Sequence, residues 1–340
     1  MADLTLEDIA RLAGVSRSTV SRVVNEHPNV SADVRKRVLE VIRTTGFHPN
    51  LAARTLASNR SWMLGLVLPR TVSGFFADPY FPRLTQGIAQ ACNDHNYTLA
   101  LFLVTTKEDE ERIFPRVSRK GFLDGVLVQS AAIGDQLIDR LAETSIPMVV
   151  AGRPFHAENI SYIDVDNVAA SRNAMDHLIR LGYRRIAHIG GSPNSPVTLD
   201  RKEGYMQALR EAGRAVDPAL IVDSDFSEGS GYQAMRQLLT MGVDAVFTAS
   251  DILAIGGMRA VREAGLRVPQ DVAFVGFDDL PLTSPIGLGL TTVRQPVYPF
   301  GYKAIETLID VINNGILPPR RVIMDTELII RESCGAPQER

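Results

Sequence analysis

The chain has 340 residues and a formal net charge of −3, with 45% hydrophobic and 22% charged residues, which excludes an intrinsically disordered protein. Its length predicts two or three domains. No apolar string approaches the roughly 18 residues of a membrane-spanning helix, no secretion signal is recognisable, and the two cysteines form neither a disulfide framework nor a zinc motif, so we expect a cytoplasmic protein with no membrane partner.

The first 60 residues differ in charge from the rest of the chain. They hold nine Arg and Lys against six Asp and Glu, a net of +3, whereas the other 280 residues hold 27 against 33, a net of −6. The overall negative charge, which argues against a nucleic-acid partner, therefore conceals a basic segment. Such a segment favours an anionic partner, although many small basic segments are only solvated surface.

Three apolar stripes at helical spacing predict three short helices in this basic segment. Thr5 and Asp8 form a capping-box pattern before the first helix, Gly14 ends it, and Ser16 and Ser31 are the predicted N-caps of the second and third. The stripes are Leu6, Ile9, Ala10 and Ala13, then Val20, Val23 and Val24, then Val34, Val38 and Ile42.

Two short helices joined by a turn with glycine predict a helix-turn-helix, whose second helix enters the major groove of DNA. Arg17 and Ser18 lie at the start of that helix and Arg22 one turn later, so we expect them to read base edges, where arginine binds guanine in a bidentate way. The alternative is a small helical domain with surface arginines. Hydroxyl groups placed for phosphate contacts are those of Ser16, Thr19 and Ser21.

The rest of the chain alternates continuous apolar runs with amphipathic helical stretches. Such runs predict strands buried on both faces, hence doubly wound parallel sheets covered by helices, and about a dozen strands suggest two of them. The predicted strands are 63–68, 98–104, 125–129, 147–151, 185–189, 244–248 and 272–276. The predicted helices are 79–95, 107–120, 134–143, 167–181, 200–213, 228–241, 251–264 and 299–314.

Catalytic motifs are missing from the sequence. It holds no GxxxxGK, GxSxG, HExxH or strict GxGxxG, and its six histidines are scattered, so we predict neither catalytic residues, nor a metal, nor a cofactor, and no enzyme. The stretch Gly190-Gly191-Ser192 follows a predicted strand, which favours ligand binding over catalysis.

The string 5–25, TLEDIARLAGVSRSTVSRVVN, and the stretch 46–57 resemble the LacI/GalR family of bacterial transcription regulators. The resemblance implies that the second stretch contains a hinge helix, in which Leu56 matches a leucine that wedges into the minor groove of the operator. An ordinary amphipathic helix is the alternative. So short a segment is not stable alone, which favours folding on DNA. Further DNA contacts are assigned to Thr5, Asn25, Asn50, Ala53 and Ala57.

The rest of the chain resembles the core of the same family, which shares its fold with periplasmic sugar-binding proteins. The resemblance is carried by Asp78-Pro79-Tyr80-Phe81, Gly152-Arg153-Pro154, Val275-Gly276-Phe277-Asp278-Asp279 and the stretch 290–296. It implies a DNA-binding domain at 1–49, a hinge and linker at 50–61, and an effector-binding core at 62–334. Within that core it implies an N-subdomain of 62–161 and 294–319 and a C-subdomain of 162–293 and 320–334.

The family places its effector in the cleft between the two subdomains. Arg201, Asp251 and Asp278 match family effector positions, and aspartates bind sugar hydroxyls well because each carboxylate accepts two donors. An N-cap role is the alternative for Asp251 and the preferred role for Asp166, and a structural salt bridge is the alternative for Arg153. The predicted effector-binding residues are Phe76, Tyr80, Phe81, Gln129, Arg153, Arg201, Ser250, Asp251, Asp278 and Gln295.

These features predict a dimeric repressor that binds a palindromic operator on double-stranded DNA and is released by a small sugar. The loop 70–78 is longer than in many relatives. A purine is the alternative effector. An exported sugar-binding protein is opposed by the helix-turn-helix and the missing signal, and an enzyme of doubly wound type by the absent catalytic constellation. The C-terminus lacks leucine heptads, which argues against a tetramer.

Overall fold

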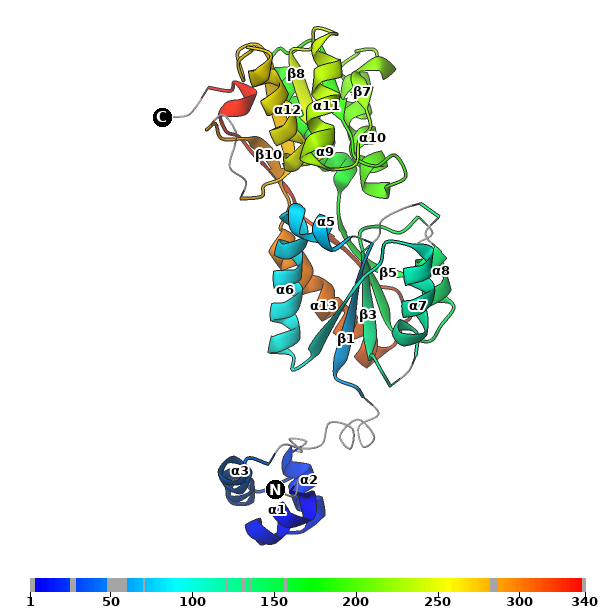
Figure 1. Cartoon of the computed structure of the whole chain (residues 1–340), viewed down its shortest axis with the longest axis vertical. Coiled ribbons are helices and arrows are strands. Elements are labelled where there is room, and N and C mark those ends of the chain that lie inside the picture. The colour runs from blue at the N-terminus through cyan, green and yellow to red at the C-terminus, as the bar shows by residue number, and fades with distance from the viewer. Residues whose placement is uncertain are drawn as a thin grey trace. The chain divides into compact units, whose positions relative to one another are not determined.

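The computed structural model describes residues 4–24, 29–47, 60–69, 71–119, 121–129, 133–134, 136–155, 158–281 and 287–337. The chain divides into two compact units, Met1–Trp62 and Met63–Arg340, each described here by itself (Figure 1). None of the helices in the described ranges has both the length and the apolar character needed to cross a lipid bilayer.

The first unit is a bundle of three helices, α1 (Leu6–Ala13), α2 (Arg17–Val24) and α3 (Ala32–Thr45). The three predicted apolar stripes meet in one core, which confirms the helical spacing as the signal of this fold. Phe47, which follows α3, completes that core and was not among the predicted positions. The buried members of the core are Ile9, Ala10, Ala13, Val20, Val23, Val38 and Phe47.

The ends of these helices are fixed by local hydrogen bonds. The hydroxyl of Thr5 accepts from the backbone N–H of Asp8, whose carboxylate accepts from the backbone N–H of Thr5, so the predicted capping box is confirmed. Ser16 likewise accepts a backbone N–H in the first turn of α2. Ser31 is the N-cap residue of α3, as predicted, but its side chain makes no cap hydrogen bond.

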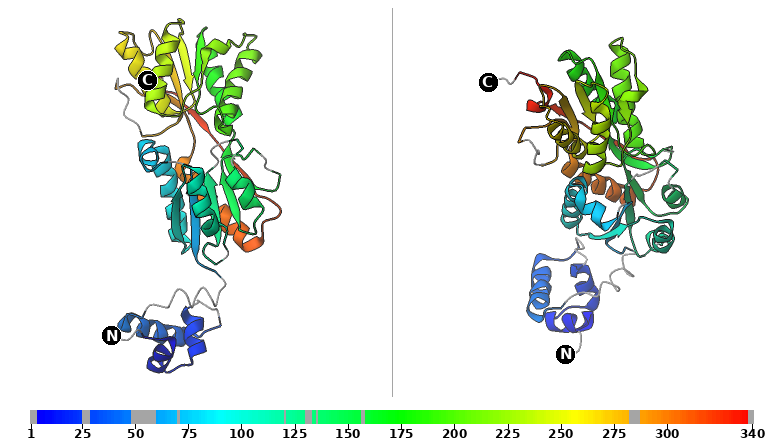
Figure 2. Two further views of the ribbon diagram at one scale, coloured as in Figure 1. Left: turned by 45° about the vertical axis from the view of Figure 1, so that its right-hand side comes forward. Right: turned by 45° about the horizontal axis from the view of Figure 1, so that its top comes forward.

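The second unit begins with a six-stranded parallel sheet in the order β11-β5-β4-β3-β1-β2. Helices α6 (Tyr80–Asp94) and α13 (Val297–Asn314) cover one face, and α7 (Lys107–Val117) and α8 (Gln136–Ala142) cover the other (Figures 1 and 2). The strands are β1 (Met63–Leu68), β2 (Thr98–Leu103), β3 (Gly125–Gln129), β4 (Met148–Ala151), β5 (Ser161–Val165) and β11 (Arg321–Met324).

A second six-stranded sheet has the order β12-β10-β9-β8-β6-β7 and is parallel except for the pair β10 and β12. Helices α9 (Asn167–Arg180) and α10 (Pro196–Glu211) pack on one face, and α11 (Glu228–Leu239) and α12 (Asp251–Glu263) on the other. The strands are β6 (Ile186–Ile189), β7 (Ile221–Val222), β8 (Ala245–Thr248), β9 (Ala273–Asp278), β10 (Thr291–Arg294) and β12 (Glu327–Ile329).

The predicted fold class, two doubly wound sheets, is confirmed, and all seven predicted strands are present. The strands that sequence patterns missed are β5, β7, β10, β11 and β12, which are only two to five residues long. The 3-10 helices η1 (Pro218–Leu220) and η2 (Glu332–Cys334) and the helix α5 (Val72–Ala77) were not predicted either. Helix α5 occupies much of the segment that was expected to be a long loop.

The chain crosses between the two sheets three times, after β5, after β10 and after β11. The predicted subdomain boundaries at 161/162 and 319/320 are wrong. They assign residues 162–165 of β5 and all of β11 to the C-subdomain, whereas both strands belong to the first sheet. Residues 321–324 pair with residues 162–165 in parallel register, and the backbone N–H of Tyr162 donates to the carbonyl of Arg320 at 2.8 Å. The crossings therefore lie after these strands and not before them.

Candidate functional site

The outer surface of α2 carries the residues predicted to read DNA bases. Val20 and Val23 are buried in the core of the first unit, whereas Arg17, Ser18 and Arg22 are exposed. The Arg17 side chain is 67% exposed and forms an ion pair with Glu7 of α1, with 3.1 Å between Nε and Oε1. A pair this exposed contributes little stability and leaves the guanidinium available to DNA.

The hydroxyl groups of the helix-turn-helix are already hydrogen-bonded to one another. The Oγ atom of Ser16 lies 2.8 Å from the Oγ of Ser18 and 2.8 Å from the Oγ1 of Thr19. Thr5 is engaged in the capping box, and Ser21 is half-buried. The remaining predicted DNA contacts, Asn25, Asn50, Ala53, Leu56 and Ala57, lie outside the described residues.

In the second unit, a cavity of about 330 Å³ lies where residues from both sheets and their helices converge. Such a place, at the carboxyl ends of parallel strands, is where open α/β sheets bind ligands. The structure brings seven of the ten predicted effector residues to it: Tyr80, Phe81, Gln129, Arg201, Ser250, Asp278 and Gln295.

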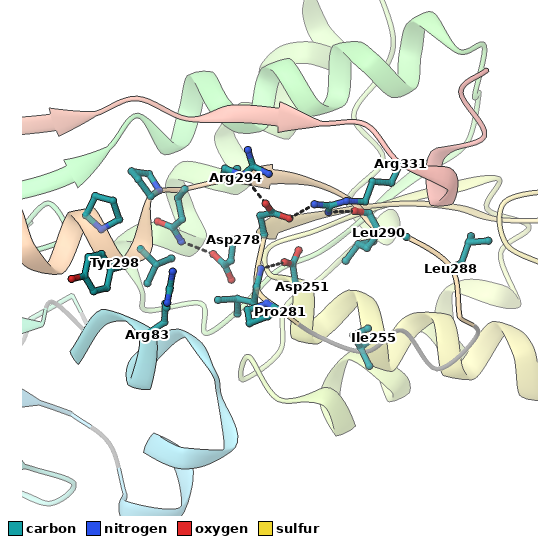
Figure 3. Close-up of a pocket in the computed structure, with 17 residues that line it drawn as sticks. Arg83, Asp251, Ile255, Asp278, Pro281, Leu288, Leu290, Arg294, Tyr298 and Arg331 are labelled. Atoms are coloured by element: carbon teal, nitrogen blue, oxygen red, sulfur yellow. Dashed lines mark hydrogen bonds and ion pairs between the residues drawn. The ribbon is translucent and has the colours of Figure 1, made fainter. Parts of the chain in front are cut away.

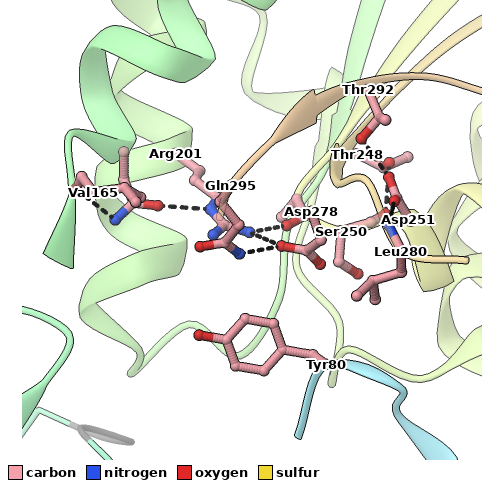
Figure 4. A network of polar contacts seen from close by, with 12 residues as sticks. Tyr80, Val165, Arg201, Thr248, Ser250, Asp251, Asp278, Leu280, Thr292 and Gln295 are labelled. Atoms are coloured by element: carbon pink, nitrogen blue, oxygen red, sulfur yellow. Dashed lines mark hydrogen bonds and ion pairs between the residues drawn. The ribbon is translucent and has the colours of Figure 1, made fainter. Parts of the chain in front are cut away.

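Arg201 and Asp278 form a buried ion pair at the cavity, with 3.6 Å between Nη1 and Oδ1 (Figure 4). The two side chains are only 5% and 7% exposed. The guanidinium also donates to Asn167 Oδ1 at 2.9 Å and to the carbonyl of Ala249, and Gln295 donates to Asp278. Both charges are therefore held rigidly before any ligand arrives, which favours tight and directional binding.

The backbone of Asp278 is strained, because its φ of 118° and the 54° of Asp279 fall in a region that side chains other than glycine rarely adopt. Burial raises the pKa of Asp278 well above its usual value, although Arg201 opposes the change. Strain and desolvation both cost folding free energy. Such costs concentrate at functional sites, which supports a binding role for this carboxylate.

Several cavity residues were not among the predicted ones. Asp164 and Asn167 lie at the end of β5 and the start of α9, where Asn167 donates to Asp164 at 3.1 Å. Phe226 has a φ of 64°, and a side chain at Gly191 would come within 1.9 Å of its ring. Gly191 thus provides room for an aromatic ring rather than for the ligand itself, while Ser192 lines the cavity.

Three predicted effector residues do not line this cavity: Phe76, Arg153 and Asp251. Phe76 is 70% exposed, because α5 buries its neighbour Phe75 instead. Arg153 donates to both carboxylate oxygens of Asp200, at 2.7 and 2.9 Å, so the salt bridge weighed as its alternative is the observed contact. Asp166 caps α9 by accepting from the backbone N–H of Ala169, as predicted.

Asp251 does not line the 330 Å³ cavity; it lines a larger neighbouring one, and its carboxylate is fixed by buried hydrogen bonds. It is 2% exposed, and its carboxylate accepts from Thr292 Oγ1 at 2.5 Å and from the backbone N–H of Leu280 at 2.9 Å (Figure 4). The carboxylate fits because Gly276 has no side chain; a Cβ there would lie 2.3 Å from Oδ1. The N-cap of α12 is Ser250, so the alternative cap role of Asp251 is wrong.

The burial of Asp251 predicts that the stability of the protein depends on pH. Burial raises the pKa of Asp251 to about 7, while an unfolded aspartate titrates near about 4. The folded state therefore binds the proton more tightly, and the free energy of unfolding should fall as pH rises from about 4 to about 7 and then level off. Urea unfolding of the wild type and of Asp251→Asn across this pH range tests the prediction. As pH rises, the wild type should lose stability relative to the variant. A difference in unfolding free energy that stays constant with pH would contradict the raised pKa of Asp251.

A larger cavity of about 770 Å³ lies beside the first and shares Asp278 and Gln295 with it (Figure 3). Three of its charged groups are paired with one another: Asp279 accepts from Arg294 at 2.7 Å and from Arg331 at 2.6 Å. The smaller cavity is the better ligand site, because it combines a preformed charged pair with aromatic side chains. Among the described residues, no cluster of three His, Cys, Asp or Glu side chains is placed to hold a metal ion.

Two family models match the chain. The model for bacterial regulatory proteins of the lacI family matches residues 5–50, which contain the helix-turn-helix. The model for a periplasmic binding protein-like domain matches residues 175–334, which contain most of the second sheet.

Known proteins are similar to this chain over nearly its whole length. The HTH-type transcriptional regulator CelR of Thermobifida fusca is 37% identical over 97% of this chain and 98% of its own. The HTH-type transcriptional regulator AglR of Rhizobium meliloti strain 1021 is 35% identical over 99% of this chain and 96% of its own. A solved structure described as a transcriptional regulator CelR-cellobiose complex has a TM-score of 0.77 and 36% identity, covering 97% of this chain and 99% of that one.

Proposed function

This chain belongs to the LacI family of bacterial regulatory proteins. From that premise we propose that a sugar bound in the 330 Å³ cavity controls the binding of this protein to operator DNA. Like the other members of the family, it is a DNA-binding transcriptional regulator and not an enzyme. We expect it to act in the cytoplasm on genes for carbohydrate use.

The observation that carries the sugar assignment is the set of side chains at the cavity. Asp164, Asn167 and Asp278 present carboxylate and amide groups, which suit a ligand rich in hydroxyls. Tyr80 and Phe226 supply aromatic surface for the C–H face of a pyranose. The likeness to a regulator solved with cellobiose supports the same class of ligand.

The mechanism follows from the position of this cavity between two sheets that three chain crossings connect. A ligand that binds both sheets favours the arrangement in which they lie closer, and so shifts the balance between two conformations. In a dimer this shift moves the two first sheets relative to each other. The DNA-binding units then lose the spacing that a palindromic operator demands, and the repressor is released.

A homodimer is supported by the edge of the first sheet. Strand β2 is the last strand on its side, so its outer backbone groups have no neighbouring strand within this sheet. Its sequence, TLALFL, is apolar, and Leu101 is 44% exposed. A long apolar edge invites association unless another chain covers it, and a second copy placed symmetrically also supplies the second recognition helix.

The test is an operator-release experiment. The full chain is used to select a palindromic DNA from a random pool, and sugars and purines are then screened for those that raise its melting temperature. We expect a sugar to bind and to release the DNA, and sedimentation of the complex to show two copies of the chain per operator. Release by a purine instead of any sugar would contradict the effector assignment, and one copy per operator would contradict the dimer.

A further inference from the structure

We propose that the effector is at least a disaccharide, whose second ring occupies a separate cavity of about 380 Å³ next to the 330 Å³ cavity. This inference rests on the proposed sugar effector. The second cavity lies at the carboxyl ends of β1, β2 and β3 and at the start of α7, which is again where parallel sheets bind ligands.

The two cavities adjoin, because Pro69 and Gln129 line both of them. A ligand in the first cavity therefore lies next to residues of the second. One sugar ring in each cavity, with the glycosidic bond at Gln129, is the arrangement that this shared border suggests.

Gln129 carries an unmet hydrogen-bonding group at this junction. Its Oε1 atom is buried and accepts no hydrogen bond from the protein. A buried acceptor without a donor costs folding free energy, which a donor on a bound ligand would recover. A hydroxyl group of a ligand that spans the two cavities would donate to this oxygen.

The chemistry of the second cavity suits an uncharged sugar ring. Thr105, Thr106 and Gln136 supply hydroxyl and amide groups, and Glu110 is neutralised by Arg140, whose Nη1 donates to its Oε1 at 2.8 Å. Lys107 also lines this cavity and is exposed. Apolar side chains for the C–H face of a sugar are those of Val67, Val104, Val128 and Leu137.

The first measurement compares ring number. Calorimetry on the full chain uses glucose, galactose, mannose and xylose, together with cellobiose, maltose, lactose, mannobiose and xylobiose. We expect one disaccharide to bind at least tenfold more tightly than the monosaccharides from which it is built. A monosaccharide that binds as tightly as its disaccharides overturns the proposal, and so does a panel in which no disaccharide binds.

The second measurement fills the second cavity. Thr105→Trp adds a large ring to an exposed position on its wall, so the affinity for the disaccharide should fall at least tenfold, towards that of the monosaccharide. Glu108→Trp is the matched control, since Glu108 is exposed nearby and lines neither cavity. An unchanged disaccharide affinity in Thr105→Trp, or an equal loss in the control, overturns the proposal.

Two readouts keep this test separate from the proposed function. If Thr105→Trp lowers the melting temperature, the Gln136→Ala variant is used in its place. That substitution removes an exposed amide from the wall of the same cavity and adds no bulk. Operator binding without sugar is measured alongside. A chain that binds and releases its operator with a monosaccharide keeps the proposed function and loses only the second subsite.

Discussion

Asp278→Ala should abolish the response to effector while leaving operator binding without effector intact. The substitution removes the carboxylate that lies in the cavity and leaves the buried guanidinium of Arg201 without its partner. Loss of one member of a buried ion pair costs about 3–5 kcal/mol of folding stability, and alanine tolerates a φ of 118° poorly, so we expect stability to fall by about 3 kcal/mol or more. Calorimetry with the effector and urea unfolding measure the two effects.

Asp278→Asn separates binding from folding. Asparagine keeps the shape and adopts positive φ more readily than alanine, so it should lose less stability than the alanine variant. It removes the charge, and hydrogen bonds to charged groups contribute about 1.5–3 kcal/mol, so effector affinity should still fall at least tenfold. Wild-type effector affinity in both variants would show that Asp278 does not touch the ligand.

Arg17→Ala should weaken binding to the cognate operator by about 1–3 kcal/mol and relax the preference at one base position. Arg17 begins α2, is exposed, and is restrained only by the surface ion pair with Glu7. The loss should therefore be specific, because a bidentate arginine contact discriminates guanine from the other bases. Gel shifts on the operator and on its single-base variants measure it.

Arg43→Ala is the matched control for this experiment. It removes the same charge from the same unit, from the exposed side of α3 where Arg43 pairs with Glu40 at 2.6 Å. We expect at most a small loss that is equal on all sequences and that shrinks with added salt, as electrostatic attraction does. If Arg17→Ala behaved in the same uniform way, its base-reading role would be refuted.

Periodicity in the sequence predicted the elements that are long and apolar. The strand β1 was predicted with its observed bounds, Met63–Leu68, because its apolar run ends at Pro69, a residue that seldom continues a strand. Strands such as β7, with two residues, have too few positions for a period to show. Helix α5 was missed because most of its six residues are exposed and only Phe75 is buried, so it lacks an apolar stripe.

The site was predicted where a residue matches a family position and missed where its role depends on a distant contact. Arg201 and Asp278 were recognised by family likeness and do line the cavity. Asp251 was assigned to the cavity from the same likeness, but its carboxylate fits against Gly276, which is 25 positions away in the sequence. No local pattern reveals such a fit, nor the positive φ that places Phe226 over Gly191.

The place of β11 in the first sheet has a consequence for the order in which the protein forms during synthesis. That sheet takes its edge strand from residues 321–324, and α13, which packs against α6, comes from residues 297–314. The ribosome must therefore release nearly the entire polypeptide before this sheet is complete, whereas the described core of the helical bundle at the start of the chain lies within the first 47 residues. A nascent chain thus carries a finished DNA-binding unit ahead of an effector-binding unit that is still open, and a premature stop before residue 297 removes effector control first.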